Sequence, residues 1–246
     1  MNELRLLRIT ETFTIKRFIR DIKYVSFIIV LPVLFYVMFT AIFPKNAAVD
    51  GLSWNKYSLI SMISFAIVGN AINLLGTRVA IERNDRWMDY IRVSPVSSLY
   101  YSISFAITFI LISLLTIVIL FVTAFVWQGV SLSLGEYIGT TVLLLIGSIP
   151  FVLIGLLIGH LGSAAQPVGM IFYLSLSFLG GLWMPVEAMP ENIQSFARVL
   201  PTYSLANLGW EFLGKTSLEK SLVVLLFYLI ITIVLLVIVR KKECSS

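Results

Sequence analysis

Long apolar runs separated by short polar stretches dominate this chain of 246 residues. A helix of about 20 apolar residues crosses the hydrocarbon core of a bilayer, and it satisfies its own backbone hydrogen bonds there. Six runs are candidates, at 24–43, 57–79, 101–126, 137–159, 168–183 and 221–239. The fifth is the shortest and is rich in glycine. The pattern therefore predicts an all-α integral membrane protein with six transmembrane helices.

Composition agrees with this pattern, because 59% of the residues are hydrophobic and only 13% are charged. A soluble domain of this length needs far more polar surface. The net charge of +5 would suggest a nucleic-acid partner in a soluble protein, but the positions of the basic residues point to membrane orientation instead. We expect no nucleic-acid partner and a lipid bilayer around the chain.

The basic residues also predict the orientation of the chain. If the N-terminus is cytoplasmic, most of the 18 lysines and arginines fall on the inner side: before the first run, between the second and third, and after the sixth. The positive-inside rule then places both termini in the cytoplasm. We expect a multi-pass protein of the bacterial cell (plasma) membrane.

Residues 1–23 predict a helix that lies along the membrane surface. Ile15, Phe18, Ile19 and Ile22 follow the i, i+3, i+4, i+7 spacing of one helical face, and basic residues lie off that face. A basic amphipathic helix next to a span tends to lie in the interface plane. It serves either as an anchor or as a contact for a cytoplasmic partner.

Segment 82–100 is the longest strongly polar stretch between two runs. Charges of both signs alternate along it, and Trp87, Tyr90 and Ile91 share a helical face. Ser94 and Pro95 should end the helix, because the residue before proline avoids the α region. Such a helix can enter a groove on another protein, or it can lie as a solvated loop on the lipid surface.

Segment 184–220 follows the fifth run and lies outside by this topology. Pro185, Pro190 and Pro201 divide it into two apolar-faced pieces, neither of which is long enough to span. Non-helical backbone is tolerated at membrane depth only where protein or a cavity surrounds it. The segment is therefore either a pair of re-entrant half-helices that cover an outward path or a hairpin on the outer surface.

Candidate chemistry is sparse. The chain has one histidine and one cysteine, so a Cys/His metal site is excluded, and no P-loop or nucleophile-elbow sequence occurs. We expect no catalytic residue, no metal and no cofactor in this chain. Asn70 and Asn73 in the second run suit polar contacts between helices, and Gly155 and Gly159 suit close helix packing.

Two motifs carry a family resemblance. One combines Glu82, Arg83 and Arg86 with the later Arg92, Ser94 and Pro95; the other is the run Leu179–Asn192, which contains two glycines and two prolines, followed by Leu200–Tyr203. On these motifs the chain resembles the membrane permease subunits of type-2 ABC transporters, the group of daunorubicin-resistance and nodulation-export permeases. The resemblance covers nearly the whole chain as one transmembrane domain, 1–246.

The resemblance implies a set of partners and roles. The permease would pair with a second copy or a sibling, and a cytoplasmic ABC ATP-binding protein would hold ATP and Mg and perform the hydrolysis. Segment 82–100 would be the coupling helix, and 184–220 would form the outer gate. The implied coupling residues are Glu82, Arg83, Arg86, Trp87, Arg92, Ser94 and Pro95, and the implied gate residues are Trp183, Pro185, Pro190, Pro201 and Tyr203.

The function that follows from the resemblance is that of a multidrug-efflux-like exporter. It would form a dimeric path for a hydrophobic or amphiphilic substrate such as a drug, an antibiotic, a peptide or a lipid. Two other classes stay open: a membrane sensor or assembly subunit that transports nothing, and an ion-coupled carrier. The scarcity of acidic residues inside the runs disfavours the carrier.

Overall fold

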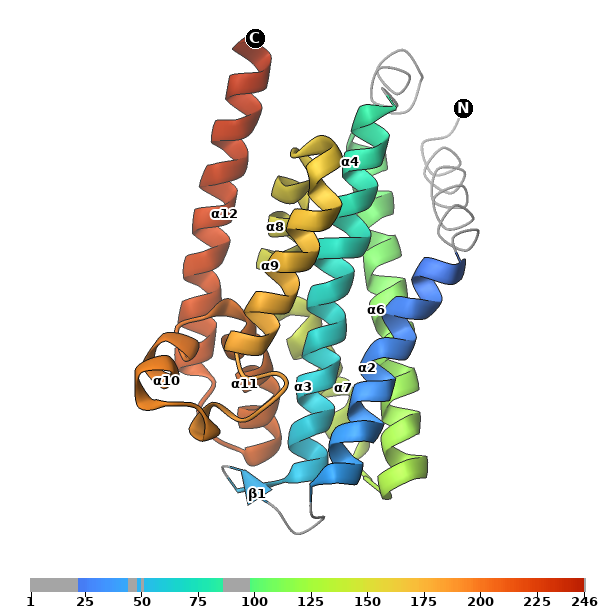
Figure 1. The fold of residues 1–246 in the computed structure, drawn as a ribbon, viewed down its shortest axis with the longest axis vertical. Coiled ribbons are helices and arrows are strands. Elements are labelled where there is room, and N and C mark those ends of the chain that lie inside the picture. The colour runs from blue at the N-terminus through green and yellow to red at the C-terminus, as the bar shows by residue number, and fades with distance from the viewer. Residues whose placement is uncertain (1–21, 44–47, 50, 86–97, 246) are drawn as a thin grey trace.

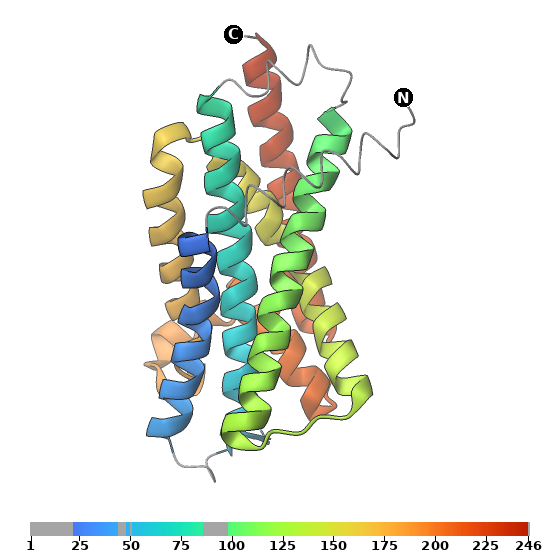
Figure 2. The ribbon, with the colours of Figure 1, turned by 90° about the vertical axis from the view of Figure 1, so that its right-hand side faces the viewer.

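A computed structural model describes residues 22–43, 48–49, 51–85 and 98–245 of the chain. Long helices run roughly side by side in one bundle (Figures 1 and 2). We call the end that holds the short hairpin β1–β2 and the base of α11 the lower end. The end that holds Asn84 and the C-terminus is the upper end (Figure 1).

The elements of the bundle are predominantly helical. The α-helices are α2 (Ile22–Ile42), α3 (Trp54–Gly69), α4 (Gly76–Asn84), α6 (Ser98–Gln128), α7 (Leu134–Gly147), α8 (Ile149–Gly159), α9 (Ala165–Leu179), α10 (Glu191–Ala197), α11 (Pro201–Gly214) and α12 (Glu219–Ser245). A π-helical segment, η1 (Asn70–Leu75), and two 3₁₀ turns, η2 (Gly162–Ala164) and η3 (Val186–Ala188), join them. The antiparallel strands β1 (Ala48–Val49) and β2 (Leu52–Ser53) pair with each other.

Within the described ranges, five helical stretches are long and apolar enough to cross a membrane. They are Trp54–Asn84, Ile103–Gln128, Leu134–Gly159, Gly162–Leu179 and Glu219–Val239. A shorter apolar stretch, Ile28–Ile42, lies in α2, where the sequence predicts the first span. The described chain is thus all-α in its main architecture, whereas the number of six crossings stays a prediction.

One of these stretches lies at the centre of the bundle. α3, η1 and α4 follow each other without interruption from Trp54 to Asn84, and we call this unit the central helix. Its 31 residues correspond to roughly 46 Å at 1.5 Å per residue. The whole of its apolar window is buried, since α2, α6, α8, α9 and α11 all pack against it. Among the candidate spans in the described ranges it has the most deeply buried apolar window.

The stretch Leu134–Gly159 is bent where the sequence predicts one continuous span. α7 ends at Gly147, and α8 begins at Ile149 after Ser148. Pro150 has no N–H to donate and disfavours a continuing α-helix in the residues before it. The Ser148 hydroxyl instead donates to the Leu145 carbonyl at 2.6 Å. The proline thus divides the span into two helices without separating them.

The fifth predicted span, 168–183, ends earlier than expected because a glycine terminates α9 at Leu179. Gly181 has a φ of +76°, a conformation that favours glycine. The N–H of Gly181 donates to Phe178 O at 3.2 Å, and the N–H of Leu182 donates to Ser177 O at 3.1 Å. These two bonds form a Schellman motif, which ends a helix and redirects the chain. Trp183 therefore lies beyond the helix.

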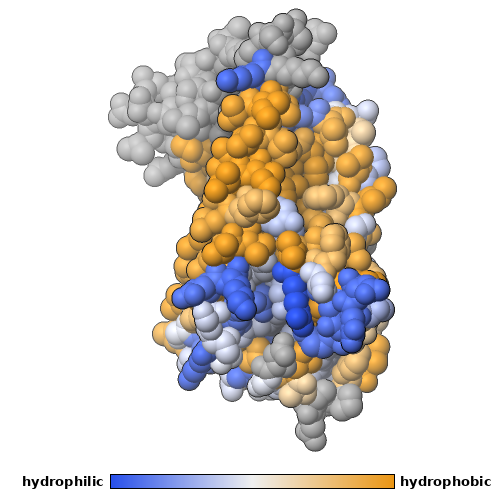
Figure 3. Space-filling view, turned by 90° about the vertical axis from the view of Figure 1, so that its left-hand side faces the viewer, coloured by the Kyte–Doolittle hydropathy of each residue, from blue (hydrophilic) through white to orange (hydrophobic). Residues whose placement is uncertain are grey.

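After this turn the chain continues toward the lower end. The Thr202 hydroxyl, in the first turn of α11, donates to Leu176 O of α9 at 2.6 Å, so α11 begins beside the last turns of α9. α11 then runs along α7 and α3 to the lower end, and α12 rises from there along α8 and α11 (Figure 1). Figure 3 shows the outcome on one face, where a broad apolar region lies above a polar band at the lower end.

Candidate functional site

The upper end of the central helix carries the first residues of the predicted coupling segment. Glu82 is 5% exposed, and its Oε1 lies 3.2 Å from Nε of Arg78, one turn earlier. Arg83 is half-buried, and the helix ends with Asp85 as its C-cap. The structure thus places Glu82 against its own helix and inside the bundle, where it can position this helix end.

The other predicted coupling residues lie outside the residues that the structure describes. They are Arg86, Trp87, Arg92, Ser94 and Pro95. The surface helix predicted at 1–23 also lies outside them, apart from the start of α2. The predicted roles of these residues stay predictions.

A π-helical segment forms the middle of the continuous central helix. η1 spans Asn70–Leu75, and every one of its residues is buried. Asn70 Nδ2 donates to Ser113 Oγ of α6 at 3.2 Å, while Asn70 Oδ1 is buried without a hydrogen-bond partner among the described residues. Single π turns inside α-helices occur frequently at functional sites. The sequence predicts a polar contact here but not the change of helix type.

Asn73 contacts a different neighbour from Asn70, although the sequence places both on one helical face. Its Oδ1 lies near Gly169 of α9, where an added Cβ would come within 3.2 Å. A π turn contains more residues than an α turn, so the two side chains separate around the axis. Asn70 thus contacts α6, whereas Asn73 lies next to α9.

Glycines bring α8 unusually close to the central helix. A Cβ on Gly155 would overlap the carbonyl oxygen of Ala71 in η1, and a Cβ on Gly76 would lie 2.8 Å from the Gly155 carbonyl. A Cβ on Gly159 would lie 2.8 Å from Val79. The close packing that the sequence predicts for Gly155 and Gly159 is therefore confirmed, and it occurs within the chain.

The predicted gate residues begin with Trp183, which lies among aromatic rings from three helices. Its ring makes edge contacts with Phe35 of α2 at 5.4 Å, Phe65 of α3 at 5.9 Å and Phe178 of α9 at 6.0 Å between centroids. Its Nε1 has no hydrogen-bond partner in the described part of the chain. Trp183 thus connects α9 and the central helix with α2.

The prolines of the predicted gate occupy three different places. Pro185 precedes η3, Pro190 is the N-cap of α10, and Pro201 starts α11 and is buried. Between them, Val186, Met189 and Ala197 form a small separate core, against which Tyr203 packs. The segment is therefore a folded unit with its own core.

The apolar face predicted for α10 is only partly buried. Ala197 is fully buried and Leu200 is 7% exposed, but Ile193 and Phe196 are 38% and 56% exposed. Ala197 packs into the small core, whereas Phe196 beside it stays exposed. The expected apolar face is therefore buried only at Ala197 and Leu200.

The lower part of the central helix is joined to α11 by an aromatic stack. The rings of Tyr57 and Trp210 lie parallel within 9° at 4.2 Å between centroids, and Trp210 Nε1 donates to Tyr57 O at 3.1 Å. Tyr203 makes an edge contact with the same Trp210 ring at 5.8 Å. Sequence reasoning did not assign Trp210 to a site, although Glu211 follows it directly in an otherwise apolar stretch.

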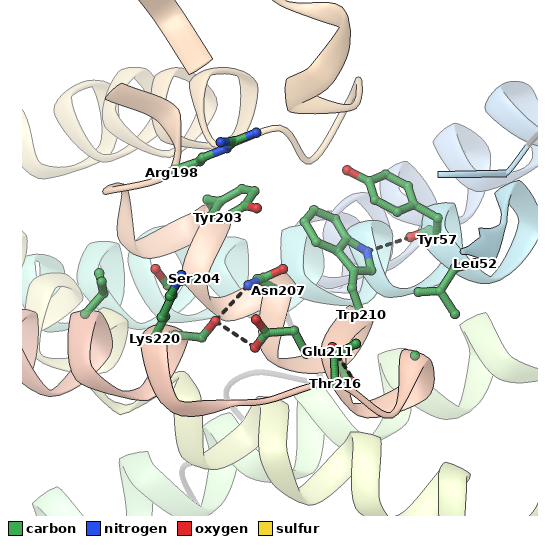
Figure 4. Close-up of a pocket in the computed structure, with 13 residues that line it drawn as sticks. Leu52, Tyr57, Arg198, Tyr203, Ser204, Asn207, Trp210, Glu211, Thr216 and Lys220 are labelled. Carbon is green, nitrogen blue, oxygen red and sulfur yellow. Dashed lines mark hydrogen bonds between the residues drawn. The ribbon is translucent and has the colours of Figure 1, made fainter. Parts of the chain in front are cut away.

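A polar pocket of about 420 Å³ lies beside this stack, and we call it the lower pocket (Figure 4). α11 and the first turns of α12 form its walls, with contributions from β2 and α3. Its polar lining residues include Arg198, Tyr203, Ser204, Asn207, Glu211, Thr216, Lys220 and Ser221. Apart from Tyr203, sequence reasoning assigned none of them to a site.

No group of histidine, cysteine and acidic residues that could hold a metal occurs in the described ranges. The only charged residue buried there is Glu82, and it pairs with Arg78. The features described above are instead helix contacts, a folded segment after α9 and one polar pocket.

Comparison with known proteins identifies the family of this chain. The family model described as "ABC-2 type transporter" matches residues 6–210. Over 246 residues the chain is 30% identical to the "Putative transport permease YvfS" of Bacillus subtilis (strain 168), and the match covers 99% of both proteins. The match to the Bacillus subtilis protein therefore spans the central helix, the folded segment after α9 and the lower pocket. The chain belongs to the ABC-2 type transporter family of membrane permeases.

Proposed function

We propose that this chain is the permease subunit of an ATP-driven exporter. It pairs with a second copy or a sibling to form the path, and a separate cytoplasmic ABC ATP-binding protein holds ATP and Mg and supplies the energy. Both termini face the cytoplasm of a bacterial cell. Membership of the ABC-2 family supports the ATP-binding partner and the membrane location.

The observation that carries this proposal is the continuity of the central helix. Its lower part contacts Trp210 and Trp183, and its upper part ends at Asn84 with Asp85 as the C-cap. A displacement of the upper end by a partner would be transmitted along one buried helix to the lower segment. Such a helix could switch between two packings that the ATP state of the partner biases.

The folded segment after α9 is the proposed outer gate. α11 has 14 residues, which correspond to roughly 21 Å and fall short of a hydrocarbon core of about 30 Å. Its first turn is hydrogen-bonded to α9 above the lower end, which supports a re-entrant position. In this arrangement Trp183, Pro185, Pro190, Pro201 and Tyr203 would close the path on the outer side.

A hydrophobic or amphiphilic cargo fits the side chains that are available. Buried positions in the described ranges are mostly apolar or hydroxyl-bearing, and Glu82 is the only charged one. An ion-coupled carrier relies on ionisable relays inside its spans. Because Glu82 pairs with Arg78 near the helix end, the structure offers little support for such a relay.

The coupling role of segment 82–95 can be tested with the partner ATPase. We would co-express the chain with the ABC ATP-binding protein of its genetic neighbourhood, purify the complex and reconstitute it in liposomes. Trp87→Ala combined with Arg92→Ala should abolish co-purification and coupled ATP hydrolysis, since tryptophan and arginine dominate interface energies. The matched control is Trp127→Ala with Lys215→Ala, which changes the same kinds of residue at exposed positions.

Two outcomes would contradict the proposal. If the double variant assembles and hydrolyses ATP like the wild type, segment 82–95 is not the coupling element. If no ATP-binding protein associates with the wild-type chain, the sensor or carrier class becomes the better description. If the wild-type complex hydrolyses ATP as proposed, a screen for substrate-stimulated hydrolysis in the same liposomes would identify the cargo.

A further inference from the structure

The lower pocket presents a carboxylate that the protein has fixed in place. Asn207 Nδ2 donates to Ser221 Oγ at 2.9 Å, and Ser221 Oγ donates to Glu211 Oε2 at 3.1 Å (Figure 4). Ser221 is 3% exposed, so this chain of donors lies in the protein while the carboxylate lines the pocket. A prepositioned carboxylate favours a cationic ligand group that can donate hydrogen bonds.

Two basic side chains line the same pocket without pairing with Glu211. Arg198 and Lys220 both belong to the lining, and Arg198 and Glu211 come from different parts of the wall (Figure 4). Arg198 instead forms an ion pair with Glu187 at 3.9 Å, and both of these side chains are exposed. No ion pair among the described residues joins Glu211 to either base. A ligand that carries both an anion and a cation could contact both groups.

The position of the pocket adds an apolar requirement. α12 begins its candidate span at Glu219, so Lys220 and Ser221 lie where the apolar run starts, at the depth expected for lipid headgroups. Val224 continues the lining; the adjacent Val223 is 64% exposed, and Phe227, one turn further along α12, is 58% exposed. An apolar tail leaving the pocket would lie along this exposed side of α12.

We propose that the lower pocket binds the headgroup of a zwitterionic phospholipid with a primary ammonium group. The ammonium donates to the Glu211 carboxylate, the phosphate contacts Arg198 and Lys220, and an acyl chain follows α12. A primary ammonium has three hydrogen-bond donors, whereas a quaternary one has none. The lipid is a resident ligand of the membrane, so the proposal is independent of ATP coupling and of the cargo.

Lipid binding can be measured on the full chain by native mass spectrometry in detergent. The probes are phosphatidylethanolamine, phosphatidylcholine and phosphatidylglycerol with identical acyl chains, and free phosphoethanolamine. We expect the wild type to retain phosphatidylethanolamine about tenfold more tightly than the other two lipids, the factor that one charge-assisted hydrogen bond supplies. Free phosphoethanolamine should bind much more weakly than the lipid, because it has no tail.

Substitutions separate the two halves of the headgroup. Glu211→Gln keeps an oxygen that can accept from Ser221, and it should remove the preference for phosphatidylethanolamine without weakening the binding of phosphatidylglycerol. Lys220→Gln should weaken all three lipids. The matched controls are Glu219→Gln and Lys215→Gln, which neutralise neighbouring charges outside the lining and should change nothing.

Three results would overturn the proposal. Equal retention of the three lipids by the wild type would show that the ammonium is not recognised. An unchanged preference in Glu211→Gln would remove the carboxylate from the site. Binding of free phosphoethanolamine as tight as that of the lipid would make the pocket a site for a soluble ligand.

Discussion

The central helix and α12 are opposites in composition and in burial. The most apolar window of the central helix has a mean hydropathy of 1.8 and is wholly buried, while that of α12 has 3.5 and is 11% buried. In a soluble protein the more apolar helix would occupy the core. Here the less apolar helix does so, because lipid accepts an apolar surface as readily as another helix does.

The two helices therefore use different means of association. The central helix buries Ser58, Ser61, Ser64, Asn70 and Asn73, and glycines let α8 approach its backbone. α12 contacts α8 and α11, and large apolar side chains such as Phe227 and Ile230 remain exposed. Buried polar side chains and close-packed glycines thus distinguish the central helix from α12, whereas both helices carry bulky apolar residues.

The largest expected difference between the two helices comes from one shared substitution. Ile63→Ala on α3 removes a side chain that is 0% exposed and should destabilise the fold by about 2–5 kcal/mol through the cavity it leaves. Ile230→Ala on α12 changes a residue that is 62% exposed, and lipid can fill the space. Thermal unfolding of both purified variants measures the difference. Equal destabilisation would show that α12 is packed as tightly as the central helix.

A smaller effect should follow from adding one methyl group at the closest helix contact. Gly155→Ala places a Cβ against the Ala71 carbonyl and should cost about 1–3 kcal/mol of stability, as overpacking does. Gly135→Ala is the matched control, because a Cβ there meets nothing within 4 Å. The yield of monodisperse protein in size-exclusion chromatography, followed by thermal unfolding, compares them. A stable Gly155→Ala variant would mean that α8 lies further from the central helix.

The smallest expected effect concerns the polar contact inside the bundle. Asn70→Ala and Ser113→Ala, alone and combined, form a double-mutant cycle on the bond of 3.2 Å between α3–η1 and α6. Hydrogen bonds between membrane helices contribute about 0.6 kcal/mol on average, so we expect a coupling energy of that order. A coupling energy of zero would assign the burial of Asn70 to something other than this bond.

Much of the architecture could be predicted from the sequence because it depends on local composition. The apolar runs predict the main helices, although the fifth run is predicted to continue to residue 183 and α9 ends at Leu179. The spacing of Gly155 and Gly159 predicts a close contact because only small residues permit one.

The remaining features depend on residues far apart in the sequence. The π-helical segment Asn70–Leu75 contacts α6, α8 and α9, and the local sequence does not predict a π-helix there. The lower pocket combines Leu52 and Tyr57 with α11 and the start of α12, so its walls meet only in the folded chain. Hydropathy identifies α12 and the central helix as spans but does not say which of them faces lipid.

The most direct test of the account is the sidedness of the segment that follows the central helix. Ser94→Cys and, separately, Ser217→Cys would be introduced into a Cys244→Ser background, because Cys244 is the only cysteine. Intact cells would then be treated with a membrane-impermeant maleimide. The account predicts that Ser94→Cys, like the native Cys244, is labelled only after permeabilisation, whereas Ser217→Cys is labelled in intact cells. Labelling of Ser94→Cys in intact cells would contradict it.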